Sequence, residues 1–201
     1  MEDFSLKKRL ELHELWVKSC GAEGVRLDLM GQSIRGIHEH DAVLTGASLN
    51  DTDLRDAEMI NTNFIGSDLR DADLRGAQLE GSDFSAASLS GVRFRGADLD
   101  NANLERAKLA YADLRDATFA GANLIEADLM CANLRGVNLS KAKLRGASLL
   151  AADLSGANLT GADFSYADLQ GASLEGAKVD RNTNFFNAKV DPNEFKEVDH
   201  T

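Results

Sequence analysis

Three features of the sequence predict an all-β solenoid built from one short repeat. Every fifth residue from Leu44 to Val179, here called the central residue, is Leu, Phe, Met or Val. The residue two places earlier, from Ala42 to Ala177, is always Ala, Ser, Thr or Val. Fifteen of the 17 Gly residues, from Gly31 to Gly176, stand two places after a central residue or after a position that continues the same five-residue spacing before Leu44. So short a period, kept without exception, is typical of a repeat array in which each unit packs on its neighbours.

A period of five residues excludes a continuous helix or a flat strand. On an α-helix, five residues advance about 500°, so successive central residues would spread around every face. On a flat strand, every fifth side chain would change sides. The chain must therefore turn a corner once per repeat, and Gly is suited to such corners. We expect the central residue and the small residue to point inward together.

The residues before the repeats predict a capping helix. Phe4 to Lys18 read as an amphipathic helix, with Ser5 available as N-cap and Gly21 just beyond the end. The first coil of a solenoid leaves an open core end and unpaired strand edges, which a helix can cover. The expected apolar stripe consists of Leu6, Leu10 and Val17, widened by Leu12, Leu15 and Trp16.

The expected organisation has three parts: residues 1–24 form the capping helix and turn, 25–181 the repeat array, regular from 42, and 182–201 a C-terminal cap and short tail. The register begins at Leu29 and Ile34 and fails at Glu39. The segment 38–41 could supply metal ligands through His38 and His40, but two His on one extended segment are a weak metal signal. An imperfect first coil or loop is the preferred interpretation.

The pattern is lost again near the C-terminal end. There the five-residue spacing places Asn182 and Asn184 at the two inward positions, and Phe185 and Phe186 are expected to plug the end of the core. Residues 193–198 could form one helical turn or remain disordered.

Composition limits the partners and the compartment. The chain has 201 residues and a formal net charge of −11, which argues against direct binding to nucleic acid or to an anionic membrane. Cys20 and Cys131 lack the spacing of a metal site or a disulfide framework. The sequence shows no apolar run of membrane-spanning length and no signal-peptide pattern at its start. We expect a cytoplasmic protein.

At the level of individual repeats the sequence resembles a known family. Segments such as 72–76 (ADLRG) and 157–161 (ANLTG) are similar to the A(D/N)LXX motif of pentapeptide-repeat proteins, and about two-thirds of the chain follows this motif. The resemblance implies a right-handed quadrilateral β-helix with four pentapeptides per coil. His13, Trp16 and Gly24 also resemble an N-terminal cap that is common in that family.

A 20-residue coil can be tested on the sequence itself. Arg follows the central residue eight times, and six of these residues are spaced by 20. They define the Arg ladder: Arg35, Arg55, Arg75, Arg95, Arg115 and Arg135. Phe64, Phe84 and Phe164 share another column. At 20 residues per coil, residues 42–181 make seven coils, a rod of roughly 34 Å at about 4.8 Å per layer.

The sequence predicts no catalytic, metal-binding or cofactor-binding residues, and no cofactor. A filled tube offers no concavity in which reacting groups could converge. All four His residues lie outside the regular array, and no phosphate-binding loop, nucleophile motif or zinc spacing is present. The many Asp residues recur at outward positions of the repeats and are interpreted as a solvated surface. We therefore do not expect an enzyme.

Two outward groups of residues are candidates for partner recognition. The apolar patch occupies matching positions in three successive coils, with Ile125 and Tyr166 expected near its edge, and consists of Ala110, Tyr111, Met130, Cys131, Leu150 and Ala151. Exposed apolar patches often mark association sites, although scattered apolar residues are also tolerated on surfaces. The acidic cluster consists of Glu58, Glu80, Asp98 and Asp100.

Two functions follow from these surfaces. The preferred one is a non-enzymatic, acidic scaffold or protein-interaction module with an unidentified partner, which could be a second copy of the chain. The alternative comes from the resemblance: some family members mimic DNA and protect or inhibit type II topoisomerases such as DNA gyrase. Outward charges over residues 42–181 sum to −1, −3, −1 and −2 on the four faces, and the Arg ladder opposes such mimicry.

Overall fold

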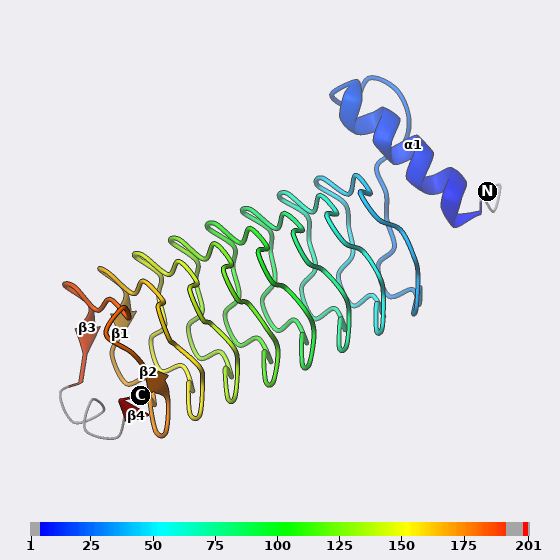
Figure 1. The fold of residues 1–201 in the computed structure, drawn as a ribbon. Coiled ribbons are helices and arrows are strands. Elements are labelled where there is room, and N and C mark those ends of the chain that lie inside the picture. Colours follow the sequence, from blue (N-terminus) through cyan, green and yellow to red (C-terminus); the bar gives the residue numbers. More distant parts are fainter. Residues whose placement is uncertain (1–4, 192–198, 201) are drawn as a thin grey trace.

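The computed structural model describes residues 5–191 and 199–200 and is a right-handed quadrilateral parallel β-helix with an N-terminal capping helix (Figure 1). The helix α1 comprises Leu6–Lys18. Within the described residues, two-residue strands occur only near the C-terminal end: β1 (Asp168–Leu169), β2 (Lys178–Val179), β3 (Lys189–Val190) and β4 (Asp199–His200). The remaining layers are joined by single-residue parallel bridges. The predicted fold class is confirmed.

The backbone ladder fixes the size of a coil. Bridges join residues 20 apart, from Asp28 and Ser48 to Asn158 and Lys178. Each central N–H donates to the coil that follows, as Leu74 does to the Arg93 carbonyl at 2.8 Å. A further bond within each repeat closes its corner. The four-sided coil of four pentapeptides is therefore the repeating unit of the fold.

The interior contains both inward residues of each repeat. Along the regular array the central side chains are buried, and so are the small residues two places before them from Ala47 on, whereas Ala42 is partly buried. Phe64 stacks on Phe84 with ring centroids 4.5 Å apart. Where Thr or Ser replaces Ala, its hydroxyl donates to a backbone carbonyl: Thr52 to Leu29 at 2.9 Å is one example. These bonds satisfy polar atoms that burial would otherwise leave without partners.

Helix α1 lies at the N-terminal end of the solenoid, as predicted (Figure 1). Leu6 and Leu10 pack against the core, and the buried residue of the helix is His13. Leu15 is 40% exposed, so its predicted place on the buried stripe is wrong: the helix meets the first coil along a narrower line. The chain turns back at Gly24. A β-carbon at this position would lie 2.7 Å from the backbone nitrogen of Trp16, so only Gly fits.

The first coil keeps its ladder where the sequence pattern fails. His38 bridges to Glu58, and the Glu39 N–H donates to the Glu58 carbonyl at 3.0 Å. A half-buried Glu39 occupies a central position in this first coil, at the end of the array. The segment is thus an imperfect coil rather than a loop.

The predicted register at the C-terminal end is wrong by one residue. Asp163 bridges to Asn184, and β1 pairs with β3 with the same spacing of 21 residues. Thr183 and Phe185 therefore take the inward positions, while Asn182 and Asn184 are exposed. Phe185 stacks on Phe164 with centroids 5.2 Å apart.

Only one of the two aromatic residues at this end acts as the expected plug. Phe185 continues the core, but Phe186 is 60% exposed because it follows the central position and points outward. Strand β4 pairs in parallel with β2. The turn predicted for 193–198 lies outside the described residues. In the part of the chain that the structure describes, no helix has the length and apolar character needed to cross a membrane.

Candidate functional site

The Arg ladder forms one column of the solenoid and is neutralised along its length. Arg75 binds Asp73 through two bonds, Nε to Oδ1 at 2.8 Å and a terminal nitrogen to Oδ2 at 2.7 Å. Arg55 and Arg115 bind the Asp two residues before them in the same way. The two side chains flank a central residue and both point outward, which brings them together. This geometry makes the column an ion-paired surface.

The other members of the Arg ladder reach into the next coil. Arg35 binds Asp56 at 2.7 Å, and Arg95 lies 3.6 Å from Asp116. Arg135 follows an Asn instead of an Asp, and its guanidinium reaches Asp153 at 3.4 Å. The identity of the residue two places earlier thus decides whether the pair forms within a repeat or between coils.

Asp73 is the buried centre of this surface. Besides Arg75, its Oδ2 lies 3.9 Å from Arg55 and 3.7 Å from Arg93. Burial by itself would raise the pKa of Asp73, but the hydrogen bonds from Arg75 and the charges of Arg93 and Arg75 outweigh it, so the pKa lies below its usual value. The carboxylate stays charged because three guanidinium groups surround it.

The apolar patch spans three adjacent layers at one corner of the solenoid. The Tyr111 N–H donates to the Met130 carbonyl, and the Cys131 N–H to the Leu150 carbonyl, each at 2.9 Å. Tyr111 is 64% exposed and Leu150 is 40% exposed, while Ala110 is nearly buried. The structure therefore brings the predicted patch residues into neighbouring layers, with Tyr111 and Leu150 as its most accessible large side chains.

The expected edge of the patch lies at a different corner. Ile125 and Tyr166 belong to the corner that precedes this face, and outward residues such as Lys108 and Asp128 separate the two corners. Tyr166 instead contacts Phe186, with ring centroids 5.7 Å apart and rings nearly perpendicular. The sequence does not predict this exposed aromatic pair, because the one-residue insertion hides the alignment of Phe186 with Tyr166.

The acidic cluster shares one face but its charges are partly engaged. Glu58 and Asp98 are both bridged to Gln78, and Glu80 lies one layer before Asp100. The Glu58 carboxylate lies 2.7 Å from Nδ1 of His38. One oxygen of Asp100 accepts the Ala120 N–H at 2.8 Å and the hydroxyl of Thr118. Two of the four carboxylates, those of Glu58 and Asp100, therefore have side-chain hydrogen-bond partners in the structure.

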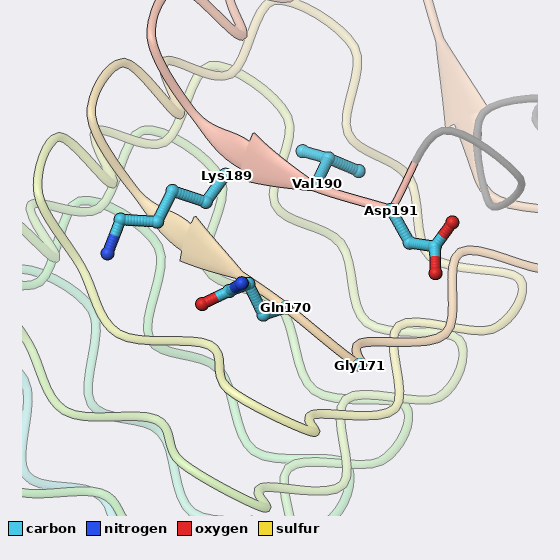
Figure 2. A pocket seen from close by; sticks show the side chains of 5 residues that line it. All are labelled: Gln170, Gly171, Lys189, Val190 and Asp191. Atoms are coloured by element: carbon cyan, nitrogen blue, oxygen red, sulfur yellow. The ribbon is translucent and has the colours of Figure 1, made fainter.

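A shallow hollow of about 400 Å³ lies near the C-terminal end of the part of the chain that the structure describes (Figure 2). Its lining consists of Gln170, Gly171, Lys189, Val190 and Asp191. The ammonium of Lys189 binds Asp168 at 2.9 Å. Among the described residues of this lining, no nucleophile stands beside a base. Among the described residues, no three His, Cys, Asp or Glu residues are placed to hold a metal ion.

Comparison with protein families gives a match to the model described as pentapeptide repeats, in eight copies over residues 40–76, 77–110, 112–149 and 144–179. Comparison with curated protein sequences gives no significant match. Among solved structures, the chain is similar to HetL from the cyanobacterium Nostoc sp. strain PCC 7120, a pentapeptide repeat protein involved in heterocyst differentiation regulation. The two share 30% identity over 88% of this chain and 90% of that one, with a TM-score of 0.54.

Two further solved structures are more distant. Rfr23 from Cyanothece 51142 is 21% identical over 90% of this chain and 99% of its own, with a TM-score of 0.44. A trypsin-treated variant of QnrB1, a plasmid-mediated fluoroquinolone resistance protein, is 22% identical over 85% of this chain and 88% of its own, also with a TM-score of 0.44.

Proposed function

The chain belongs to the pentapeptide-repeat family, and from its surfaces we propose that it is a non-enzymatic scaffold that binds a partner protein through the apolar patch. The solenoid supplies a rigid support, because every layer is bonded to the next by backbone hydrogen bonds. Function on such a support depends on the outward residues, since the inward ones are occupied by packing.

One observation carries this proposal: apolar residues occupy the same corner in three successive layers. Earlier layers of the same corner carry Asn50 and Asp51, or Arg70 and Asp71. Large side chains such as Tyr111 and Leu150 are exposed there, although nothing in the fold requires an apolar residue at an outward corner. Contiguous exposed apolar residues mark association sites, and Tyr and Met are enriched in interfaces.

A test replaces two outward residues of the apolar patch that lie in adjacent layers, Met130 and Leu150. We expect Met130→Glu with Leu150→Glu to abolish partner binding or self-association while leaving the thermal transition close to that of the parent protein. The matched control is Asn50→Glu with Ser90→Glu, which adds the same charges to the same corner column outside the patch. Light scattering measures self-association. The parent protein, the patch variant and the control are each immobilised, and the amounts of partner protein that they retain are compared. Equal assembly and equal retention by all three would refute the proposal.

DNA mimicry is the second candidate function, and the acidic cluster is the observation that favours it. Glu58 and Asp98 lie on one face, two layers apart, and Glu80 and Asp100 follow the same face. The guanidinium groups of the Arg ladder, on the neighbouring column, oppose a negative surface of the kind that DNA mimicry needs. A gyrase supercoiling assay separates the two functions: the scaffold predicts no inhibition and no protection against a quinolone, whereas dose-dependent inhibition or protection would favour the mimic.

A further inference from the structure

His13 is the buried contact between α1 and the first coil. Its Nδ1 accepts the Leu27 N–H at 3.0 Å, and its ring stacks on Trp16 with centroids 5.6 Å apart. Nε2 is buried and makes no hydrogen bond of normal geometry with the described residues. Since Nδ1 is an acceptor, the imidazole is neutral and its proton is on Nε2.

Arg26 is the charged side chain that opposes a proton on His13. Arg9, one turn earlier on α1, donates to the Asp28 carbonyl and to Gln32. Arg26, from the segment after the helix, donates to the Gly46 carbonyl at 2.6 Å. The first coil presents the backbone of Leu44 and Thr45, which carries no ionisable group. No carboxylate among the described residues forms an ion pair with His13.

We propose that His13 is an acid-sensitive latch. A proton on Nδ1 turns this acceptor into a second donor facing the Leu27 N–H, so the hydrogen bond between them is lost. Helix α1 is then released from the first coil while the array stays folded. Release is local because each layer of a solenoid contacts only its neighbours. His13 is the one buried residue of α1 in the described chain, and the other contacts of the helix with the first coil are made by partly exposed side chains such as Leu6, Leu10 and Arg9.

The direction of the pH effect follows from the same surroundings. Burial lowers the pKa of His13 below 6.5 and the charge of Arg26 lowers it further, against the raising effect of the backbone at Thr45 and Leu44. The free helix therefore binds a proton more readily than the docked one. Docking is at full strength above pH 6.5 and weakens as the pH falls from 6.5 toward the pKa of the docked state. Release uncovers the core end beside Leu27 and Leu44 and the edge of the first coil.

The chain carries its own reporter for this release. Trp16 is the only Trp residue, and it lies against His13 and near Gly21 and Gly46. We expect Trp16 fluorescence to change between pH 7 and pH 5 while the circular dichroism of the array is unchanged. In hydrogen exchange, corrected for intrinsic rates, the opening of α1 should increase by up to about tenfold per pH unit, as uptake of one proton requires.

Two variants decide the proposal. His13→Gln supplies an acceptor for the Leu27 N–H that does not titrate, and we expect it to abolish the pH-dependent opening. The control His38→Gln removes an exposed imidazole of the first coil and should leave the opening intact. If His13→Gln fails to fold, the opening of α1 is measured in the parent protein. The pH at which α1 opens must then coincide with the pH at which the NMR signal of the His13 ring titrates. Equal opening at pH 7 and pH 5, or opening of α1 and the array together, would overturn the proposal.

Discussion

Oδ1 of Asp56 lies over Gly76 in the next coil, so close that a β-carbon added to Gly76 would be 2.8 Å from it. The same relationship joins Asn61 to Gly81 and Asn101 to Gly121. Both members of each pair have positive φ: 58° for Asp56 and 70° for Gly76. Asp or Asn tolerates this conformation at a corner, and its side chain then occupies the space where the next corner would carry a β-carbon. Gly at these positions therefore provides room as well as conformational freedom.

This relationship makes Gly76→Ala more costly than an equivalent change elsewhere. Gly96 has nearly the same φ, 66°, but no atom lies within 4 Å of its added β-carbon. We expect Gly96→Ala to destabilise the array by about 1 kcal/mol through backbone strain alone, and Gly76→Ala by up to about 1 kcal/mol more, because Asp56 must leave its pair with Arg35. Chemical denaturation of both variants measures the difference, and equal losses would contradict the steric contact.

Leu114→Ala tests the stacked interior. Leu114 is 1% exposed in the middle of the array. Its truncation leaves a cavity that adjacent layers cannot fill, because the hydrogen-bonded ladder fixes their spacing, and we expect a loss of about 2 to 5 kcal/mol in the free energy of unfolding. Ser90→Ala, an outward change in the same array, should cost less than about 0.5 kcal/mol. Thermal or chemical denaturation that ranks the two variants equally would argue against the inward assignment.

Asp73→Asn tests the ion-paired centre of the Arg ladder. Asn retains the shape but loses the charge that faces Arg75, Arg55 and Arg93, and we expect a loss of about 1 to 3 kcal/mol at pH 7. The lower part of that range applies, because the guanidinium partners are about half exposed. Asp73 has a lowered pKa, so its contribution is present above pH 3.8 and is lost as the pH falls further. The difference between variant and parent should therefore shrink below pH 3.8.

The control for this prediction is Asp128→Asn. Asp128 accepts the Met130 N–H at 3.1 Å but has no ion pair among the described residues. We expect little change in stability at any pH. A pH-independent difference between Asp73→Asn and the parent protein would show that packing, rather than charge, accounts for the loss.

The sequence predicts the inward half of this molecule well, because burial imposes one requirement at every fifth position. Leu74 and Ala72, for example, are fully buried, and the five-residue pattern alone is enough to predict this burial. The pairing of the outward side chains depends instead on how far each one extends and on which charged group it meets. Arg115 and Arg135 belong to the same column, yet one binds within its repeat and the other in the next coil, because Asn133 replaces an Asp. Spacing predicts the column but not the partner.

The register error near the C-terminal end has a physical origin at Asp180. In regular layers the residue two places after the central one donates its N–H to the next coil's backbone, as Lys141 does to the Thr160 carbonyl at 2.9 Å. At Gly161 the acceptor is instead the carboxylate of Asp180, at 2.8 Å. The last coil can therefore hold 21 residues instead of 20, because the Asp180 side chain takes the place of a backbone carbonyl as the acceptor for Gly161. A strict five-residue pattern cannot reveal this substitution.

Asp180→Ala should therefore loosen the last layer while the rest of the array keeps its stability. The Asp180 carboxylate also accepts bonds from Asn182 and Thr183, and its loss leaves the Gly161 N–H without that acceptor. Bonds from the backbone of Gly161 and from Asn182 lower the pKa of Asp180 to about 2, so in the parent protein the same loosening should appear only as the pH falls from 3.8 through about 2. Hydrogen exchange of the Gly161 amide and of residues 183–190 measures the effect. Glu175→Gln, at an exposed position of the preceding side, is the control, and equal exchange in both variants would contradict this role for Asp180.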